Sequence, residues 1–143
     1  MELNLKRKKT LDVVVEEINK IIEWWMDNYP TAPISMLIDA RSKLTAYLFT
    51  FATYIGETKA EQLAAETQRK IKKSQKRKEC IGADYSIAKS EDEAILSTES
   101  EQKKADDYEG YYITLRLMLD QANKVDDAIQ QRIGILRKEK ENI

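Results

Sequence analysis

A run of cations between residues 69 and 78 is the part of this sequence best suited to chemistry. It comprises Arg69, Lys70, Lys72, Lys73, Lys76, Arg77 and Lys78. On a helix, the spacing of i, i+3, i+4 and i+7 places four of these side chains on one face: Arg69, Lys72, Lys73 and Lys76. Such a face can follow a phosphate backbone and release its counterions. A second interpretation stays open, because cations near a helix C-terminus complement its dipole and can pair with the acidic residues of 91–109.

Catalysis finds little support in the residue types. The chain has no histidine, which excludes imidazole catalysis and histidine ligation of metals. The single cysteine, Cys80, excludes an internal disulfide and a thiolate zinc cluster, and it fits a reducing, cytoplasmic compartment. Adjacent carboxylates such as Asp106 and Asp107 point in different directions on a helix, so they do not share a site. We therefore predict a non-enzymatic protein without metal or cofactor.

The length and charge pattern of the chain predict its domain organisation and cellular location. A chain of 143 residues with a net charge of −1 predicts a single helical domain over residues 1–143. Residues 1–9 contain the basic cluster Lys6–Lys9, which predicts a flexible basic arm. No signal peptide is visible, and the longest uncharged run, Leu44–Gly56, is too short to span a bilayer. We expect a cytoplasmic protein without a membrane partner.

The elements that must position these residues are helices. Four glycines and two prolines leave few turns, so the composition predicts an all-α fold with few, long helices. The apolar spacing places them at about residues 10–28, 34–79 and 90–140. A third helix of that length is too long for a monomer to cover, so it either breaks or packs against copies of itself. Candidate breaks within the helices are Gly56, Gly110 and the region of Asn123.

Local signals mark the ends of these helices. Thr10 is a candidate N-cap for the first helix, and Pro30 and Pro33 separate the first helix from the second. Gly82 is a candidate C-terminal signal for the second helix. Ser90, followed by a glutamate three residues later, matches a capping box and predicts the start of the third helix.

The segment Ala105–Leu136 predicts the surface around which the chain is organised. Its apolar residues recur at alternating steps of three and four, which is typical of a coiled-coil seam or a bundle core. The residues expected to join copies of the chain are Tyr108, Tyr112, Leu115, Leu119, Ala122, Ile129, Ile133 and Leu136. Asp126 occupies one position of this seam. It either faces water, because the stripe drifts around the helix, or sets the register of an oligomer core.

Aromatic residues follow the same helical spacing. Tyr47, Phe51 and Tyr54 share one face, and a second group lies between Tyr108 and Tyr112. Such rings can stack on single-stranded nucleic acid, but rings at this spacing are more often core residues. Trp24 and Trp25 point about 100° apart on a helix, so both cannot face one core. One of the two is therefore expected to mark a partner surface.

The order of these features resembles that of the UvsY-type recombination mediators of tailed phages, over roughly residues 40–140. The residues that carry the resemblance are the basic Lys76-Arg77-Lys78, then Gly82-Ala83-Asp84-Tyr85, Ala88-Lys89-Ser90-Glu91, the aromatic stretch 108–119 and the C-terminal helical stretch 127–138. In that family, a Lys-x-Arg pair in the basic helix is linked to binding of single-stranded DNA. The nearest match is Lys76 and Lys78, where lysine replaces the arginine. The tandem tyrosines that follow the family motif are missing, and Tyr85 remains a candidate for base stacking.

The resemblance implies a non-enzymatic ring that binds single-stranded DNA. Such a ring would help a RecA-like recombinase to displace single-strand-binding protein. Assembly through Ala105–Leu136 would repeat the basic face of 69–78 in every copy, and multivalency would raise the affinity. The alternative is a purely structural helical oligomer, such as a phage assembly adaptor or chaperone, in which the cations pair with the acidic start of the third helix. A membrane role for the Lys6–Lys9 arm is disfavoured, because the acidic residues that follow it would be repelled by anionic lipid.

Overall fold

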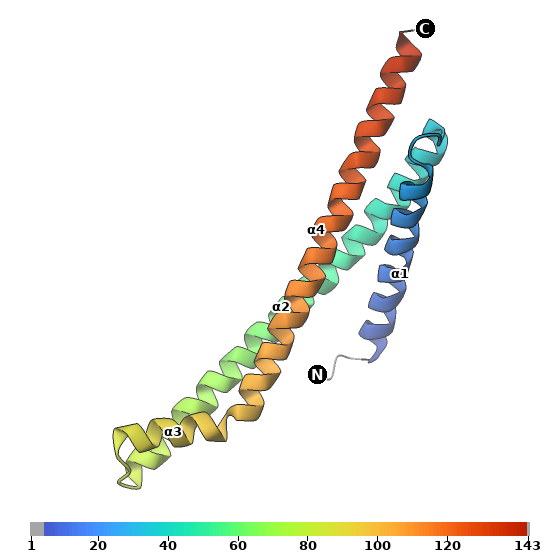
Figure 1. The fold of residues 1–143 in the computed structure, drawn as a ribbon. Helices are drawn as coiled ribbons and strands as arrows, with labels where there is room; N and C mark the ends of the chain where they lie inside the picture. Colours follow the sequence, from blue (N-terminus) through green and yellow to red (C-terminus); the bar gives the residue numbers. More distant parts are fainter. Residues whose placement is uncertain (1–4, 143) are drawn as a thin grey trace. The chain divides into compact units, whose positions relative to one another are not determined.

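The computed structural model describes residues 5–142, and its elements are all α-helices (Figure 1). These helices are α1 (Leu5–Asn28), α2 (Ile34–Gly82), α3 (Ile87–Ser97) and α4 (Glu99–Glu141). The predicted all-α class with few, long helices is confirmed. The residues before Leu5 lie outside the described part, so the predicted basic arm is described only from Leu5. From there it belongs to α1, and Thr10 lies inside this helix instead of capping it.

The link between α2 and α3 differs from its prediction in its turn and its cap. The helix ends at Gly82 as expected, but the left-handed residue is Asp84, with φ of 64°. An aspartate tolerates this conformation better than most residues do. The N-cap of α3 is Ser86, whose Oγ accepts a hydrogen bond from the Lys89 backbone N–H at 3.2 Å. Ser90, the predicted cap, lies within α3 and is fully buried.

The break that shortens the last helix falls at Thr98, which the glycine pattern did not predict. The Thr98 hydroxyl donates to the Ala94 carbonyl at 2.8 Å, which satisfies a carbonyl at the end of α3. Two glutamates then occupy the first turn of α4, where the helix dipole favours acids. The helices continue through Gly56, Gly110 and Asn123, so the expected breaks at these positions are wrong. A single glycine weakens a helix without ending it.

The chain divides into two compact units. The terminal unit combines residues up to Ile55 with residues from Leu115 onward, so it contains α1, the first part of α2 and the last part of α4. Its core consists of large apolar side chains, which follow helical spacing on all three segments. They include Leu11, Val14, Ile18, Trp25, Leu37, Leu44, Leu48, Phe51, Ile55, Leu115, Leu119, Ile129 and Ile133. Burial of such side chains is the main stabilising term for this unit.

The central unit, Gly56–Thr114, has a core of smaller and more polar residues. It contains the rest of α2, all of α3 and the start of α4. Its buried residues are Thr58, Gln62, Cys80, Ser90, Ala94, Thr98, Ala105 and Tyr108. These side chains bury less apolar area than those of the terminal unit, so hydrophobic burial stabilises the central unit less.

Candidate functional site

The predicted nucleic-acid face of α2 points largely into the central unit. Viewed along the axis of α2, three of the cations lie within about 90° of the buried Gln62 and Cys80. These cations are Arg69, Lys73 and Lys76, and all three are half-buried. The spacing that would align them on a phosphate backbone therefore turns them toward the chain's own helices. The structure groups these residues as predicted, but it does not present them as an open basic face.

Acidic residues of α3 and α4 neutralise several of these cations. The Lys72 Nζ lies 2.6 Å from a carboxylate oxygen of Glu101. The Lys73 Nζ lies 3.2 Å from Glu91, and the Arg77 Nη2 donates to Glu91 at 3.0 Å. The second interpretation of the basic run, pairing with the acids that follow it, is thus the one found here.

These contacts shift the titration of both carboxylates. The hydrogen bond from Arg77, followed by that from Lys73, lowers the pKa of Glu91 below its ordinary value of 4.5. The hydrogen bond from Lys72 lowers the pKa of Glu101 in the same direction. The lowered pKa favours the charged form of both acids, which is the form that pairs with these cations.

Few cations of the run remain available to a ligand. Lys70 and Lys78 are exposed, and neither makes an ion pair with another described residue. Lys76 pairs within its own helix with Glu79 at 3.7 Å. The candidate stacking residue Tyr85 is exposed, but the Lys89 Nζ lies 4.4 Å from the centre of its ring. One ring face is therefore already in contact with a cation.

The seam predicted to join copies of the chain is core within a single chain. Tyr108 is buried in the central unit, and Leu115, Leu119, Ala122, Ile129 and Ile133 are buried in the terminal unit. Tyr112 and Leu136 are half-buried, and the Lys59 Nζ lies 4.8 Å from the centre of the Tyr112 ring. This corrects the assignment of these residues to an oligomer interface. The periodicity identified a buried face, but the chain's own helices cover it.

Asp126 has a role that neither sequence interpretation named. Its carboxylate accepts a hydrogen bond from the Thr45 hydroxyl at 3.3 Å and lies 3.7 Å from the Arg41 Nε. Its side chain is only 17% exposed. The residue therefore links α4 to α2 inside the terminal unit, and it fixes the register of two helices of the same chain.

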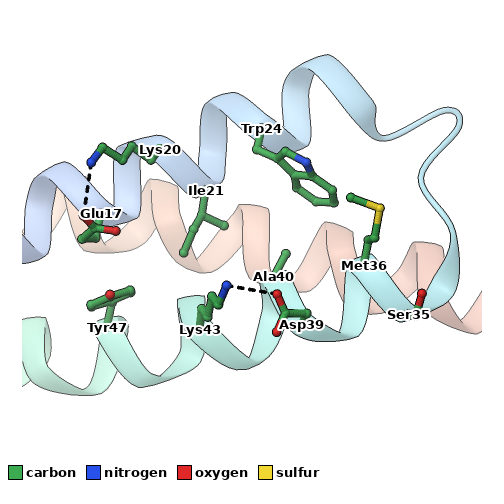
Figure 2. Close-up of a pocket in the computed structure, with 10 residues that line it drawn as sticks. All are labelled: Glu17, Lys20, Ile21, Trp24, Ser35, Met36, Asp39, Ala40, Lys43 and Tyr47. Carbon is green, nitrogen blue, oxygen red and sulfur yellow. Dashed lines mark hydrogen bonds and ion pairs between the residues drawn. The ribbon is translucent and has the colours of Figure 1, made fainter.

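A groove between α1 and α2 is the site best formed for a partner (Figure 2). It encloses about 590 Å³ within the terminal unit. Its walls are formed by Glu17, Lys20, Ile21 and Trp24 of α1 and by Ser35, Met36, Asp39, Ala40, Lys43 and Tyr47 of α2. Trp24 and Met36 point toward each other across the groove, with Ile21 and Ala40 deeper along it (Figure 2).

The charges at the rim of this groove are satisfied within each helix. The Lys20 Nζ lies 3.3 Å from Glu17 on α1, and the Lys43 Nζ lies 3.1 Å from Asp39 on α2. Both pairs are visible as dashed lines in Figure 2. Because each cation has an adjacent acid, the groove carries little net charge. Its surface consists of apolar and aromatic side chains between two neutralised borders.

The two tryptophans divide as their angular separation predicts. Trp25 is 9% exposed and packs in the core, where its ring centre lies 5.5 Å from that of Tyr29. Trp24 is half-buried and lines the groove. The angle of about 100° between adjacent helical residues predicted that one tryptophan would be buried and the other would face outward. It could not predict which of the two rings would face outward. The α2 wall was missed, because the helical spacing did not single out Met36 or Ala40, and Tyr47 was grouped with rings that are more often core residues.

Within residues 5–142 there is no cluster of three or more potential metal-ligating side chains. None of the helices in this same part is long and apolar enough to cross a membrane. No protein-family model matches the chain, and comparisons with curated proteins and with solved structures give no match either.

Proposed function

We propose that this chain is a non-enzymatic helical adaptor that binds a helical segment of a partner protein in the α1–α2 groove. The observation that carries the proposal is the pairing of Trp24 with Met36 across an apolar groove whose bordering charges are already neutralised. Tryptophan and methionine are both enriched at protein interfaces, since they bury much area and adapt to a partner surface. Because the lysines beside the groove are paired with acids, the groove offers no net positive charge to attract a phosphate backbone.

The spacing of the groove residues favours a helix as the occupant. Ile21 and Trp24 are three residues apart on α1, while Met36, Ala40 and Tyr47 follow helical steps on α2. Two parallel stripes of this kind form the walls into which an amphipathic helix lays its apolar face. The stripe from Met36 to Tyr47 is about 16 Å long at 1.5 Å per residue, which corresponds to about three helical turns. We therefore expect a partner segment with an apolar stripe of about that length and uncharged flanks.

Affinity capture with a matched pair of variants tests this proposal. The doubly substituted Trp24→Asp, Met36→Asp chain places two carboxylates in the groove. Met26→Asp places one on a residue of α1 that is 64% exposed and does not line the groove. Nuclease-treated extract from the natural host is passed over each immobilised chain, and retained proteins are identified by mass spectrometry. We expect one protein to be retained by the natural chain and by Met26→Asp, and lost with the double variant.

Recovery of the same proteins by all three chains would contradict the proposal. Retention from untreated extract that is absent from the nuclease-treated extract would contradict it as well, since the contact would then depend on nucleic acid. Circular dichroism of each variant controls for folding.

Single-stranded DNA binding, as the UvsY-type resemblance implies, is the second candidate function. The observation in its favour is that Lys70 and Lys78 are exposed and make no ion pair with other described residues. Two exposed, unpaired cations per chain give weak binding that salt suppresses, and repetition in an oligomer would be needed to strengthen it. A role as a mediator for a RecA-like recombinase and single-strand-binding protein depends on this binding.

Fluorescence anisotropy with a labelled single-stranded oligonucleotide tests the second candidate. Lys70→Ala, Lys78→Ala removes the two exposed, unpaired cations without breaking an ion pair between described residues, so we expect the fold to be preserved. If the chain binds single-stranded DNA through these lysines, the natural chain should bind the oligonucleotide at low salt. The double variant should not bind it. Absence of binding by the natural chain at low salt would remove this candidate and leave the adaptor proposal intact.

A further inference from the structure

A second groove, between α2 and α4, carries positive charge that no other residue of its lining balances. It encloses about 890 Å³ within the terminal unit, and its walls come from residues 38–49 of α2 and 130–137 of α4. The described residues that line it include Arg41 and Arg137 but no aspartate or glutamate. The α1–α2 groove differs in this respect, because each of its lysines lies beside an acid that lines the same groove.

The two arginines of this groove differ in how far they are neutralised. The Arg41 Nε lies 3.7 Å from a carboxylate oxygen of Asp126, which does not line the groove. Arg137 is exposed and forms no ion pair with any residue of the described range 5–142. The guanidinium of Arg137 is therefore available to a carboxylate, with which it can form two parallel hydrogen bonds.

Apolar side chains occupy much of the remaining groove wall. Phe49 is 78% exposed and Ile38 is 43% exposed, and both lie on the α2 side. Ile133 of α4 is buried and lines the groove as well. Exposed apolar side chains that gather in a groove mark an interaction site, because an occupant would remove their area from water.

The contacts between the two helices give their direction along the groove. The Thr45 hydroxyl donates to Asp126, and the Arg132 Nη2 donates to the carbonyl of Pro30, which precedes α2. Later residues of α4 therefore lie beside earlier residues of α2, so the two helices run antiparallel in this unit.

This direction separates charge from apolar surface within the groove. Arg137 follows Asp126 by eleven residues, so it lies about 16 Å from the level of Thr45, toward the start of α2. Arg41 lies one turn from Thr45 on that same side. Phe49 lies one turn from Thr45 on the opposite side. An occupant that matches the whole groove is acidic toward one end and apolar at the other.

We propose that the α2–α4 groove binds an acidic amphipathic helix of a partner protein. Carboxylates of this helix meet Arg137 and Arg41, while its apolar stripe covers Phe49 and Ile38. The α2 wall from Ile38 to Phe49 is about 16 Å long, which corresponds to about three turns of a helix laid beside it. Charge complementarity favours an acidic protein segment over a phosphate backbone, because a phosphate gains nothing from the apolar half of the groove.

The proposal does not depend on the adaptor proposal. The two grooves share no lining residue. Tyr47 lines the first and Phe49 lines the second, and two residues correspond to about 200° around a helix. The grooves therefore lie on nearly opposite sides of α2, and each holds its own partner.

Selection from a displayed library of helical peptides tests the proposal. Randomised peptides of about 14 residues, or four helical turns, are presented to the immobilised full chain. Binding of each selected peptide is then measured by fluorescence anisotropy. We expect a class of peptides with Asp or Glu toward one end of an apolar stripe. Phe49→Asp and Arg137→Glu should each weaken the binding of this class by about tenfold or more.

Two control variants separate this groove from other surfaces. Lys138→Glu makes the same change of charge one residue later on α4, at an exposed side chain that does not line the groove. Trp24→Asp, Met36→Asp disrupts the α1–α2 groove alone. Both controls should leave the affinity for this class of peptides unchanged. Because Phe49 and Arg137 are exposed, the melting temperatures of their variants should match that of the natural chain.

A charge exchange tests the contact with Arg137 directly. A selected peptide in which lysine replaces the acidic residue should bind the Arg137→Glu chain more tightly than it binds the natural chain. Tighter binding to the natural chain would contradict the predicted contact.

The proposal is overturned if the selection gives no peptide whose affinity depends on both Phe49 and Arg137. Equal weakening by Lys138→Glu would also overturn it, since the general charge of α4 would then account for binding. Displacement of the peptides by a single-stranded oligonucleotide would assign the groove to nucleic acid instead. Peptides that are lost only with Trp24→Asp, Met36→Asp would support the adaptor proposal and reject this one.

Discussion

Glu91 is a single residue through which acid should loosen the central unit. Its pKa is lowered chiefly by Arg77 and then by Lys73, so the charged form is favoured in the folded chain. A carboxylate with a lowered pKa contributes stability above its unfolded value, and this stability is lost as the pH falls through the folded value. We therefore expect the contribution to be complete at neutral pH and to disappear as the pH falls below about 4.5.

Thermal unfolding of Glu91→Gln at several pH values measures this contribution. The melting temperature of the variant should lie below that of the natural chain at pH 7, and the gap should close toward pH 3. Asp92→Asn is the matched control, because Asp92 is exposed and makes no ion pair with other described residues. A gap that stays constant across this range would show that Glu91 stabilises the unit without its charge.

Gly110 weakens α4 without serving a packing need. A Cβ atom added at this position meets nothing within 4 Å, and its backbone is helical without a positive φ. Gly110→Ala should therefore stabilise the folded chain by about 0.5–1 kcal/mol. Chemical denaturation monitored by circular dichroism measures the change. Destabilisation by the alanine would mean that the glycine meets a neighbour or bends the helix in solution.

Helix ends show where residue-level prediction succeeds and where it fails. Gly82 and Pro30 marked real ends, because the residues act through the local backbone. Ser90 matched a capping pattern, yet Ser86 four residues earlier caps α3. Serine is a favoured N-cap at either position, and only Ser90 has a glutamate three residues later, yet the unit buries Ser90 and leaves Ser86 exposed. Thr98 ends α3 with its hydroxyl, an arrangement that glycine and proline patterns do not reveal.

At the scale of elements, Asp126 holds α4 in register against α2. Replacing it with alanine leaves the Arg41 guanidinium and the Thr45 hydroxyl without this acceptor in a partly buried contact. We expect Asp126→Ala to destabilise the chain by about 1–2 kcal/mol. Asp120→Ala, which removes an exposed contact with Arg116 on the same helix, is the control and should cost less. Equal losses in denaturant titrations would contradict the register role.

The two units should differ in local stability. The terminal unit buries leucine, isoleucine and phenylalanine side chains, while four of the buried side chains in the central unit are Thr58, Gln62, Ser90 and Thr98. Less buried apolar surface allows local opening at lower free energy. Amides of α3 should therefore exchange hydrogen faster than those near Leu44 of α2, by about tenfold or more. Equal protection by hydrogen-exchange mass spectrometry would contradict this contrast.

The seam of α4 shows what helical periodicity can predict. The alternating steps identified Leu115, Leu119 and Ile129 as buried, and all three are core residues. The steps could not identify the covering element, because α2 of the same chain and α4 of another copy would present similar apolar stripes. The same limit applied to the basic run, since the face that aligns Arg69 with Lys73 is equally suited to phosphate or to the carboxylates of α3.

For the whole molecule, the balance of charge favours contacts with protein over contacts with nucleic acid. The net charge of −1 is the sum of nearly equal numbers of acidic and basic residues. In the central unit, cations of α2 form ion pairs with acids of α3 and α4. The sequence predicted the helical class and most of the buried face. It could not predict the α1–α2 groove, because a groove depends on which helices pair and how far apart they lie.

The most direct test of binding in the α1–α2 groove is photocrosslinking in cells of the organism that encodes the chain. A photoreactive amino acid replaces Met36, which faces Trp24 in the groove, or Met26, which lies outside it. Binding of a partner in the groove predicts a discrete protein crosslink from position 36 and none from position 26. Nuclease treatment should leave the crosslink unchanged. Crosslinks from position 36 to nucleic acid, or the same products from both positions, would contradict binding of a partner protein in the groove.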